Sequence, residues 1–234
     1  MRKIFFIRLS LLALLISWSI GHSVAQSDYK LDYFDEISVA GNIEVLLVKG
    51  DAEKAVMQTY GIPEDEVNIS VKSQTLKLSL LNSLFYKNKN ERVRITVTYK
   101  ELRSIRANAG AEIKSDEIIE ADLLEVHAGS GAQVNLQVKV NKLDGSATEG
   151  GILQLKGEAE NQKAQANTGG QYRAFDVECK NTYARAGTGG EVEIVARESL
   201  DAYASLGGQI EYKGDPDERY HRKFIGGEVR KVNF

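Results

Sequence analysis

From about residue 105 onward, apolar and polar residues alternate on both sides of recurring pairs of small residues. Alternation of this kind is the pattern of a strand with one buried face. Three residues after the first member of each pair, an apolar residue stands in every copy: Ile113, Val134, Leu153, Tyr172, Val192, Ile210 and Val229. Three residues before it, every copy except the last has alanine: Ala107, Ala128, Ala147, Ala166, Ala186, Ala204 and then Lys223. Each copy therefore predicts two short strands, one on either side of a corner.

These corners recur with a period of about 19 to 20 residues. Their small pairs are Gly110-Ala111, Gly131-Ala132, Gly150-Gly151, Gly169-Gly170, Gly189-Gly190, Gly207-Gly208 and Gly226-Gly227. Glycine suits a corner because it tolerates positive φ and close approach of another backbone. A period sustained over seven copies is typical of a stacked repeat. We therefore expect an all-β fold, a right-handed β-helix-like solenoid of stacked coils.

The first third of the chain is rich in strands but less regular. Its strand-like segments are Ile43–Val48, Val67–Val71, Leu76–Leu80 and Arg92–Tyr99. Asp51–Gly61 is the one segment where we expect a short helix, and Asn82–Asn90 is expected to be an exposed loop.

The sequence around Gly41 resembles that around Gly110, so a first coil is expected to begin near Ile37. The two glycines lie 69 residues apart, a stretch expected to hold irregular coils with insertions. We interpret the mature chain as a single solenoid domain over 26–234. Its less regular coils span 30–104 and its regular glycine-corner repeats span 105–234.

The N-terminus has the three parts of a secretory signal peptide, assigned to residues 1–25. Arg2 and Lys3 precede an apolar stretch, and Ser23-Val24-Ala25 fits the rule for a cleavage site. The apolar run after Arg8 is shorter than the roughly 20 residues that a membrane span needs. We therefore expect an exported protein, periplasmic, at the cell surface or extracellular, with no membrane span in the mature chain.

Charge and cysteine content exclude some classes of function. The formal net charge of −3 becomes −6 without Arg2, Lys3 and Arg8, and nucleic acid is a poor partner for such a chain. Cys179 is the only cysteine, so no intrachain disulfide can form, and its alternation with Val177 predicts a small buried side chain rather than a reactive thiol. No cofactor motif is present.

The histidines and the acidic C-terminal loop do not predict a metal site. His127 lies in an outward column, His221 lies in an inward column near the end of the chain, and no His or Cys pair has zinc-ligand spacing. Asp215–Glu218 lacks the alternating oxygen ligands of a calcium loop and predicts a turn.

Acidic residues leave an enzymatic alternative open. Glu125 and Asp144 are neighbours in one outward column, about 4.8 Å apart if the coils stack, which is compatible with a pair of glycosidase carboxylates. A solvated ladder of mixed charge is the simpler interpretation. A second outward column, two residues after the first glycine, alternates mainly between glutamate and glutamine: Glu112, Gln133, Ile152, Gln171, Glu191, Gln209 and Glu228.

The expected binding surface lies on the strand before each corner. Its outward positions, four and six residues before the first glycine, bring aromatic and arginine side chains together on three coils: Tyr183, Arg185, Tyr203, Tyr220 and Arg222. Tyrosine and arginine are enriched at binding hot spots, and tyrosine rings can stack on sugars. Tyrosine is also a good strand former and arginine a common surface residue, so coincidence is the alternative.

The segment Phe34 to Val45, followed by the array of glycine corners, resembles the bacterial family called putative auto-transporter adhesin, head GIN domain, over about residues 30–232. The resemblance implies an exported β-helical domain in a Gram-negative envelope, and it brings no catalytic motif. We interpret the chain as a non-enzymatic envelope or surface solenoid that binds a glycan or a surface protein. The alternatives are a polysaccharide lyase or hydrolase on the same scaffold and a purely structural envelope component.

Export is expected to cleave the chain after Ala25, because the small-residue rule is met there. The intact mass of the exported protein should correspond to a chain that begins at Gln26. Recovery of Met1 in the exported form would contradict the assignment of a signal peptide.

Overall fold

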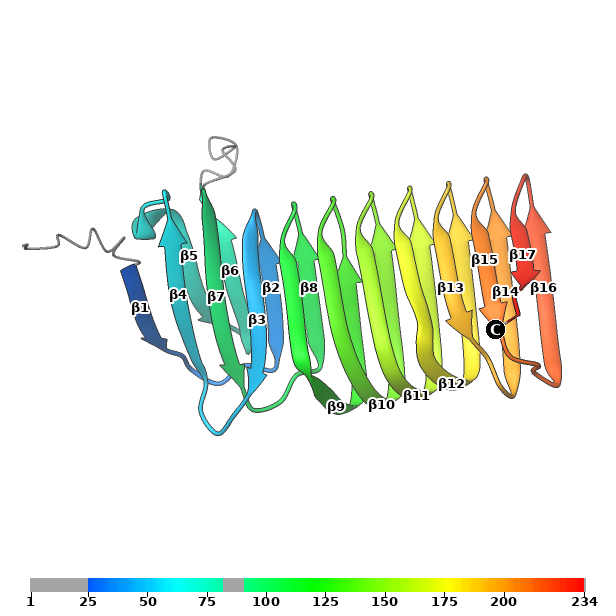
Figure 1. The fold of residues 1–234 in the computed structure, drawn as a ribbon, viewed down its shortest axis with the longest axis horizontal. Helices are drawn as coiled ribbons and strands as arrows, with labels where there is room; N and C mark the ends of the chain where they lie inside the picture. The colour runs from blue at the N-terminus through cyan, green and yellow to red at the C-terminus, as the bar shows by residue number, and fades with distance from the viewer. Residues whose placement is uncertain (1–24, 82–90, 234) are drawn as a thin grey trace, which may run out of the picture.

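The computed structural model describes residues 25–81 and 91–233 of the chain (Figure 1). The predicted signal peptide, apart from Ala25, and the predicted loop at 82–90 lie outside these residues. Within them the only helix is the short 3₁₀ turn η1 (Glu64–Glu66), and no helix has the length and apolar character that a membrane crossing requires. The strands are β1 (Ala25–Lys30), β2 (Glu36–Ala40), β3 (Ile43–Lys49), β4 (Lys54–Tyr60), β5 (Val67–Lys72), β6 (Thr75–Leu80), β7 (Arg92–Tyr99), β8 (Ser104–Asn108), β9 (Glu112–Ala128), β10 (Gln133–Thr148), β11 (Ile152–Asn167), β12 (Gln171–Gly187), β13 (Glu191–Val195), β14 (Ser199–Ser205), β15 (Gln209–Lys213), β16 (Glu218–Phe224) and β17 (Glu228–Lys231).

The strands form a solenoid whose coils lie side by side along the long axis of the molecule (Figure 1). The upstream sheet contains the strands that precede the glycine corners: β5, β6, β2, β8, the second halves of β9 to β12, β14 and β16. The downstream sheet contains those that follow the corners: β1, β4, β7, β3, the first halves of β9 to β12, β13, β15 and β17. The expected solenoid of stacked coils is confirmed.

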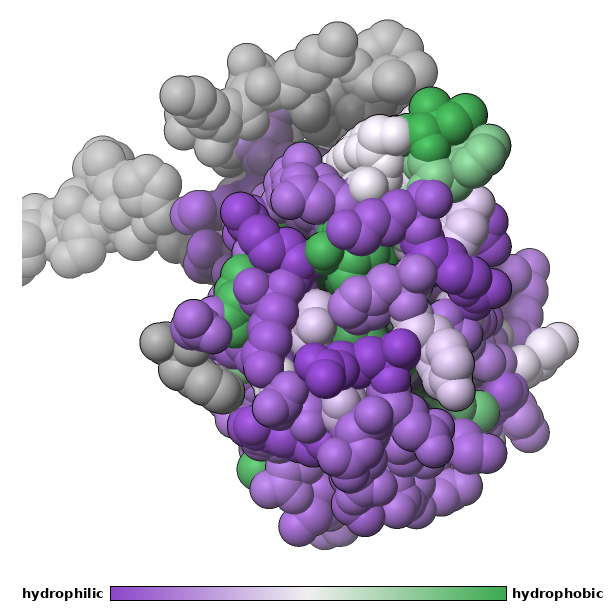
Figure 2. Space-filling model, turned by 90° about the vertical axis from the view of Figure 1, so that its right-hand side faces the viewer, coloured by the Kyte–Doolittle hydropathy of each residue, from purple (hydrophilic) through white to green (hydrophobic). Residues whose placement is uncertain are grey.

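The core consists of columns of side chains that run between the two sheets. The apolar column from Ile113 to Val229 is buried in every coil, and the alanine column is buried from Ala107 to Ala204. In the last coil Lys223 holds the position of the alanine column and His221 that of the inward column five residues before the glycine. Both are exposed, because no further coil stacks on β16 in the described residues. Figure 2 looks onto this end, where apolar side chains are visible between polar ones. The His221 ring packs edge-on against Tyr212 at 5.4 Å between ring centroids.

The two residues of each glycine pair meet different requirements. Thr168 and Gly169 both have positive φ, 51° and 71°, so they form the centre of a tight turn. Gly170 has ordinary φ, but a Cβ added there would lie 2.2 Å from the carbonyl oxygen of Ala147 in the preceding coil. The first residue of this pair is glycine because its φ is positive. The second is glycine because the backbone of the preceding coil leaves no room for a Cβ.

Hydrogen bonds continue from coil to coil through the corners. The Gly150 N–H donates to the Thr168 carbonyl at 3.2 Å, and the Gly169 N–H donates to the Thr188 carbonyl at 3.2 Å. Equivalent bonds join every pair of neighbouring corners from Gly110 to Ile225. The turns therefore form a ladder of their own beside the strand ladders.

Two coils depart from the usual core composition, with compensating changes on facing sheets. A Cβ on Gly145 would lie 2.4 Å from the ring of Tyr172, which is fully buried where other coils have aliphatic residues. The Tyr172 hydroxyl accepts a hydrogen bond from Gln162 Nε2 at 2.8 Å, inside the core. Glycine in one sheet thus makes room for tyrosine from the other, consistent with the close packing of protein interiors.

The irregular stretch expected between the first two corners in the sequence does not separate them in space. β2 pairs directly with β8, joining Ile37 to Ile105, so the coil at Gly41 stacks on the coil at Gly110. Strands β6 and β7 lie instead on the far side of β2 and β3, with which they pair in parallel. β4 and β5 add antiparallel strands beyond these, and β1 pairs with β4. The insertion therefore forms the N-terminal end of the solenoid.

The prediction of a short helix at Asp51–Gly61 is wrong, because this segment contains strand β4. Ala55 and Met57 are fully buried while the residues between and beside them are less so, which is the alternation of a strand. The neighbours β1 and β7 satisfy its backbone on both sides.

Cys179 on β12 is buried as expected, and burial raises the pKa of its thiol. Its Sγ lies 3.3 Å from the carbonyl oxygen of Asn181, to which the S–H donates. The interpretation as a small core residue is confirmed.

Leu153→Ala is expected to lower the free energy of unfolding by about 2 to 5 kcal/mol, since Leu153 is fully buried between neighbouring coils. Gln171→Ala, on the outward face of the downstream sheet, should cost no more than about 0.5 kcal/mol. Urea unfolding measures both values. Equal losses in the two variants would mean that the inward and outward columns are assigned wrongly.

Candidate ligand-binding face

The five residues predicted to bind a ligand lie on the outward side of the upstream sheet, on the consecutive coils of β12, β14 and β16. The ladder joins Tyr183 to Asp201 and Asp201 to Tyr220. The neighbouring column joins Arg185 to Tyr203 and Tyr203 to Arg222. We call these six side chains, Asp201 included, the tyrosine–arginine patch.

Within the patch, Tyr203 is flanked by two guanidinium groups. The Cζ atom of Arg185 lies 5.3 Å from the ring centroid of Tyr203, and that of Arg222 lies 5.8 Å from it. Arg222 also donates through Nη2 to the two carboxylate oxygens of Asp201, at 2.8 and 3.0 Å. The arginines are thus held over Tyr203 by cation–π contacts, and one of them is further held by an acid on the neighbouring column.

Asp201 was not among the predicted binding residues, although its column position was apparent. A shallow depression beside it is lined by Tyr183, Tyr220 and polar side chains of β12 and β14. The Tyr220 side chain is 64% exposed, whereas Tyr183 and Tyr203 are half-buried. The patch therefore offers aromatic surface, guanidinium donors and a carboxylate acceptor side by side.

The same face carries a second feature, towards the N-terminal end. We call it the charged pocket, an open depression of about 260 Å³ on β8, β9 and β10 whose polar lining side chains are Ser104, Arg106, Glu125, His127, Asp144 and Ser146. Sequence reasoning placed these residues in two columns but did not predict a depression. The depression depends on how Arg106 and its neighbours orient, which periodicity does not encode.

Glu125 and Asp144 are neighbours in the ladder, as predicted, and each carboxylate pairs with a basic side chain. Asp144 accepts from Lys163 Nζ at 2.8 Å, and Glu125 accepts from Arg106 Nη2 at 3.4 Å. These contacts form the solvated ladder of mixed charge that the sequence favoured, and the enzymatic alternative gains no support from them. In residues 25–81 and 91–233, no group of three or more His, Cys, Asp or Glu side chains could hold a metal ion.

His127 is half-buried in this pocket, with Nδ1 2.8 Å from Ser146 Oγ. Burial lowers the pKa of its imidazole, and the positive charge of Arg106 lowers it further, while Glu149 opposes the shift. The direction of the Ser146 hydrogen bond depends on the tautomer of the ring.

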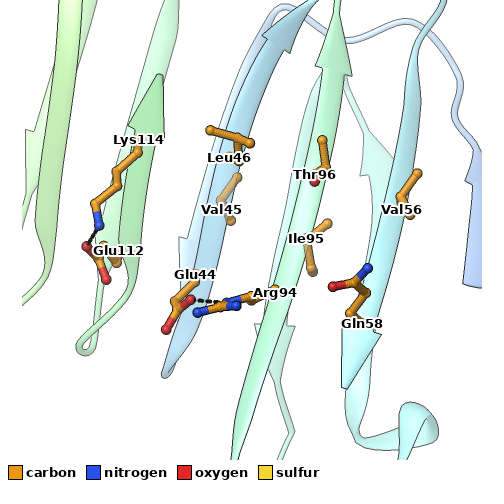
Figure 3. Close-up of a pocket in the computed structure, with 10 residues that line it drawn as sticks. All are labelled: Glu44, Val45, Leu46, Val56, Gln58, Arg94, Ile95, Thr96, Glu112 and Lys114. Atoms are coloured by element: carbon orange, nitrogen blue, oxygen red, sulfur yellow. Dashed lines mark hydrogen bonds and ion pairs between the residues drawn. The ribbon is translucent and has the colours of Figure 1, made fainter. Parts of the chain in front are cut away.

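A further shallow hollow, of about 230 Å³, lies on the opposite, downstream sheet (Figure 3). Leu46, Val56 and Thr96 line it from β3, β4 and β7. Glu44 accepts from Arg94 Nε at 2.5 Å, and Lys114 pairs with Glu112, so the charges lining the hollow are already paired. It contains none of the residues predicted to bind.

Residues 33–216 match the model of the family described as putative auto-transporter adhesin, head GIN domain. The chain belongs to this family. The match covers both the irregular N-terminal coils and most of the regular repeats, so the resemblance noted in the sequence is confirmed. Among curated proteins, none matches this GIN domain chain.

Solved structures share the fold of this GIN domain. A putative adhesin from Bacteroides fragilis NCTC 9343 superposes with a TM-score of 0.79 at 20% identity, covering 91% of this chain and 98% of that one. A putative adhesin from Parabacteroides distasonis ATCC 8503 gives 0.72 at 19% identity, covering 89% and 97%. A putative lipid binding protein from the same strain gives 0.66 at 19% identity, covering 91% and 98%. At such identities the likeness concerns the fold.

The stability of the GIN domain is expected to decrease as the pH falls from about 7 to 5, in part because of His127. Its pKa is lower in the folded protein, so the unfolded chain takes up the proton first. His127 makes its full contribution to stability at a pH above its pKa in the unfolded chain. This contribution is lost as the pH falls towards its lower pKa in the folded protein.

Urea unfolding across this pH range measures the effect, and His127→Gln should flatten the profile. His221→Gln is the matched control. Its pKa is also lowered, but the side chain is exposed and should contribute less. Profiles of the same slope in wild type and His127→Gln would show that His127 is not responsible.

Proposed function

We propose that this GIN domain is an exported adhesive domain that binds a surface glycan through the outward face of its upstream sheet. The observation that carries the proposal is the tyrosine–arginine patch, in which two adjacent columns combine aromatic rings, guanidinium groups and a carboxylate on consecutive coils. The family and the neighbours described as adhesins support an adhesive role.

The chemistry of the patch suits sugars. The apolar face of a pyranose ring packs on tyrosine, while its hydroxyl groups accept from arginine and donate to carboxylate. Because guanidinium groups cover Tyr203, we assign ring stacking mainly to Tyr183 and Tyr220, which flank Asp201. Tyr203 then holds Arg185 and Arg222 in position for hydrogen bonding.

The scaffold adds preorganisation. Tyr183 and Tyr203 stand on β12 and β14, whose alternate residues are buried in the core, and Tyr220 stands on β16, which is hydrogen-bonded to β14. Binding to such a face requires little ordering of the backbone, which lowers the entropic cost of association. A rigid face would also suit a surface protein as ligand. The experiment below distinguishes a glycan ligand from a protein ligand.

The test is a glycan array probed with the mature protein and with the double variant Tyr183→Ala/Tyr203→Ala. The double variant should bind its glycans at least tenfold more weakly, a loss of about 1.4 kcal/mol, with an unchanged β-sheet circular dichroism spectrum. Tyr60→Ala is the matched control, because Tyr60 also carries an arginine over its ring, at 4.8 Å, but lies on β4 in the downstream sheet.

Unchanged affinity in the folded double variant would refute the patch as the binding site. Absence of glycan binding, together with capture of a surface protein that depends on the two tyrosines, would replace the glycan by a protein ligand. Release of reducing ends from a bound polysaccharide would instead support the enzymatic alternative.

A further inference from the structure

The charged pocket contains one polar atom that nothing in the described chain satisfies. The Ser104 side chain is buried, with 1% exposure, and its Oγ has no hydrogen-bond partner among the described residues. Ser104 lines the pocket from β8. A buried hydroxyl without a partner costs free energy, so a ligand that bonded to it would recover this cost.

Donors and acceptors surround this hydroxyl in alternation. The Arg106 guanidinium bonds to Glu36 at 3.2 Å and to Glu125 at 3.4 Å, the acids on the strands either side of β8. His127 and Ser146 form the neighbouring pair, 2.8 Å apart. The carboxylates keep further lone pairs, because each of their two oxygens accepts more than one bond.

The charge of the pocket determines the class of ligand. Glu125 and Asp144 stand next to each other in the ladder and accept hydrogen bonds, but they would repel a second anion. Neutral hydroxyl groups fit both, since a hydroxyl donates to a carboxylate and accepts from Arg106, His127 or Ser104. Neighbouring acids in a ladder lie about 4.8 Å apart, close enough to receive two hydroxyls of one ring.

The size and position of the charged pocket narrow the class of ligand further. The volume of about 260 Å³ lies below the roughly 300 to 1,000 Å³ typical of pockets for larger organic ligands, so one small unit fits. The pocket and the tyrosine–arginine patch share the outward face of the upstream sheet, with β11 between β10 and β12. A glycan chain lying along the solenoid axis would reach both.

We propose that the charged pocket is a subsite for one neutral sugar ring, recognised through its hydroxyl groups. The inference rests on the proposed glycan-binding function and assigns a second contact on the same face. Hydroxyls of the ring bond to Ser104 Oγ, to Arg106 and His127, and to the carboxylates of Glu125 and Asp144.

The test uses free monosaccharides and backbone amide shifts in two-dimensional NMR of the mature protein. Glucose, galactose and mannose are the neutral probes, and glucuronate is the anionic probe of the same ring size. At least one neutral hexose should shift the amides around Ser104, Glu125 and Asp144 with a Kd in the millimolar range, as a small ligand with few contacts requires. Glucuronate should bind at least fivefold more weakly than the neutral hexose.

Ser104→Ala is the decisive variant, because it removes only a hydroxyl that lacks a partner and should leave the fold intact. It should weaken hexose binding at least fivefold. Ser115→Ala, a buried serine on the first half of β9 whose hydroxyl donates to the Glu117 carbonyl, is the matched control and should not change it. The double variant Tyr183→Ala/Tyr203→Ala should keep the hexose shifts.

Four results would each overturn the subsite: no hexose shifts, shifts centred elsewhere, equal binding of glucuronate, or unchanged binding in folded Ser104→Ala. These outcomes are independent of the glycan array, which tests the patch through its tyrosines. If no hexose binds at the charged pocket but the glycan array still shows binding that depends on the two tyrosines, the proposed function stands. If a hexose binds at the charged pocket but no glycan on the array is bound, the tyrosine–arginine patch is contradicted and the subsite is not.

Discussion

The parallel register between neighbouring coils is the constraint on which the rest of this structure depends. Each coil bonds to the next along both sheets and also at the corner, where the Gly150 N–H reaches the Thr168 carbonyl. A turn that continues the ladder must have positive φ at its centre and must approach the preceding coil closely. Positive φ accounts for the first glycine at every corner, and close approach accounts for the second glycine from Gly151 onward.

The same register organises the core. Because every coil repeats the backbone position of the one before, inward side chains stack in columns, and a change of volume in one column has to be balanced nearby. Gly145 and Tyr172 show this balance across the two sheets, with Gln162 supplying a partner for the buried hydroxyl. A repeat fold therefore tolerates variation in individual coils as long as the facing positions vary together.

On the outside, the ladder places side chains of neighbouring coils within reach of each other, and like charges in adjacent positions are unfavourable. At some positions opposite charges alternate, as where Lys163 follows Asp144 and Arg222 binds Asp201 across the columns. Where acids are neighbours, as Glu125 and Asp144 are, each pairs with a basic side chain. The stack of Arg185, Tyr203 and Arg222 is the aromatic form of the same arrangement. The proposed binding function would therefore use a linear array of contacts along this face.

Local periodicity was sufficient to predict the coils from Gly110 onward, the buried columns and the juxtaposition of Tyr183, Tyr203 and Tyr220. In a solenoid, residues one period apart become neighbours, so sequence spacing translates directly into contact. The coil at Gly41 could be recognised by its similarity to the coil at Gly110, but its stacking partner could not.

Tertiary structure alone decided the rest. The pairing of Ile37 with Ile105 joins residues far apart in the chain. It places strands β4 to β7 at the N-terminal end of the solenoid, because β6 and β7 pair with the other edges of β2 and β3. The strand at Lys54–Tyr60 exists because β1 and β7 satisfy its backbone, a condition invisible in the segment itself. The charged pocket arises from the orientation of Arg106 between two acids and from the burial of Ser104. Sequence by itself determined which residues share a face. Packing in three dimensions determined which of them line a depression, because the shape of the surface depends on side-chain orientation and long-range contacts that no local period encodes.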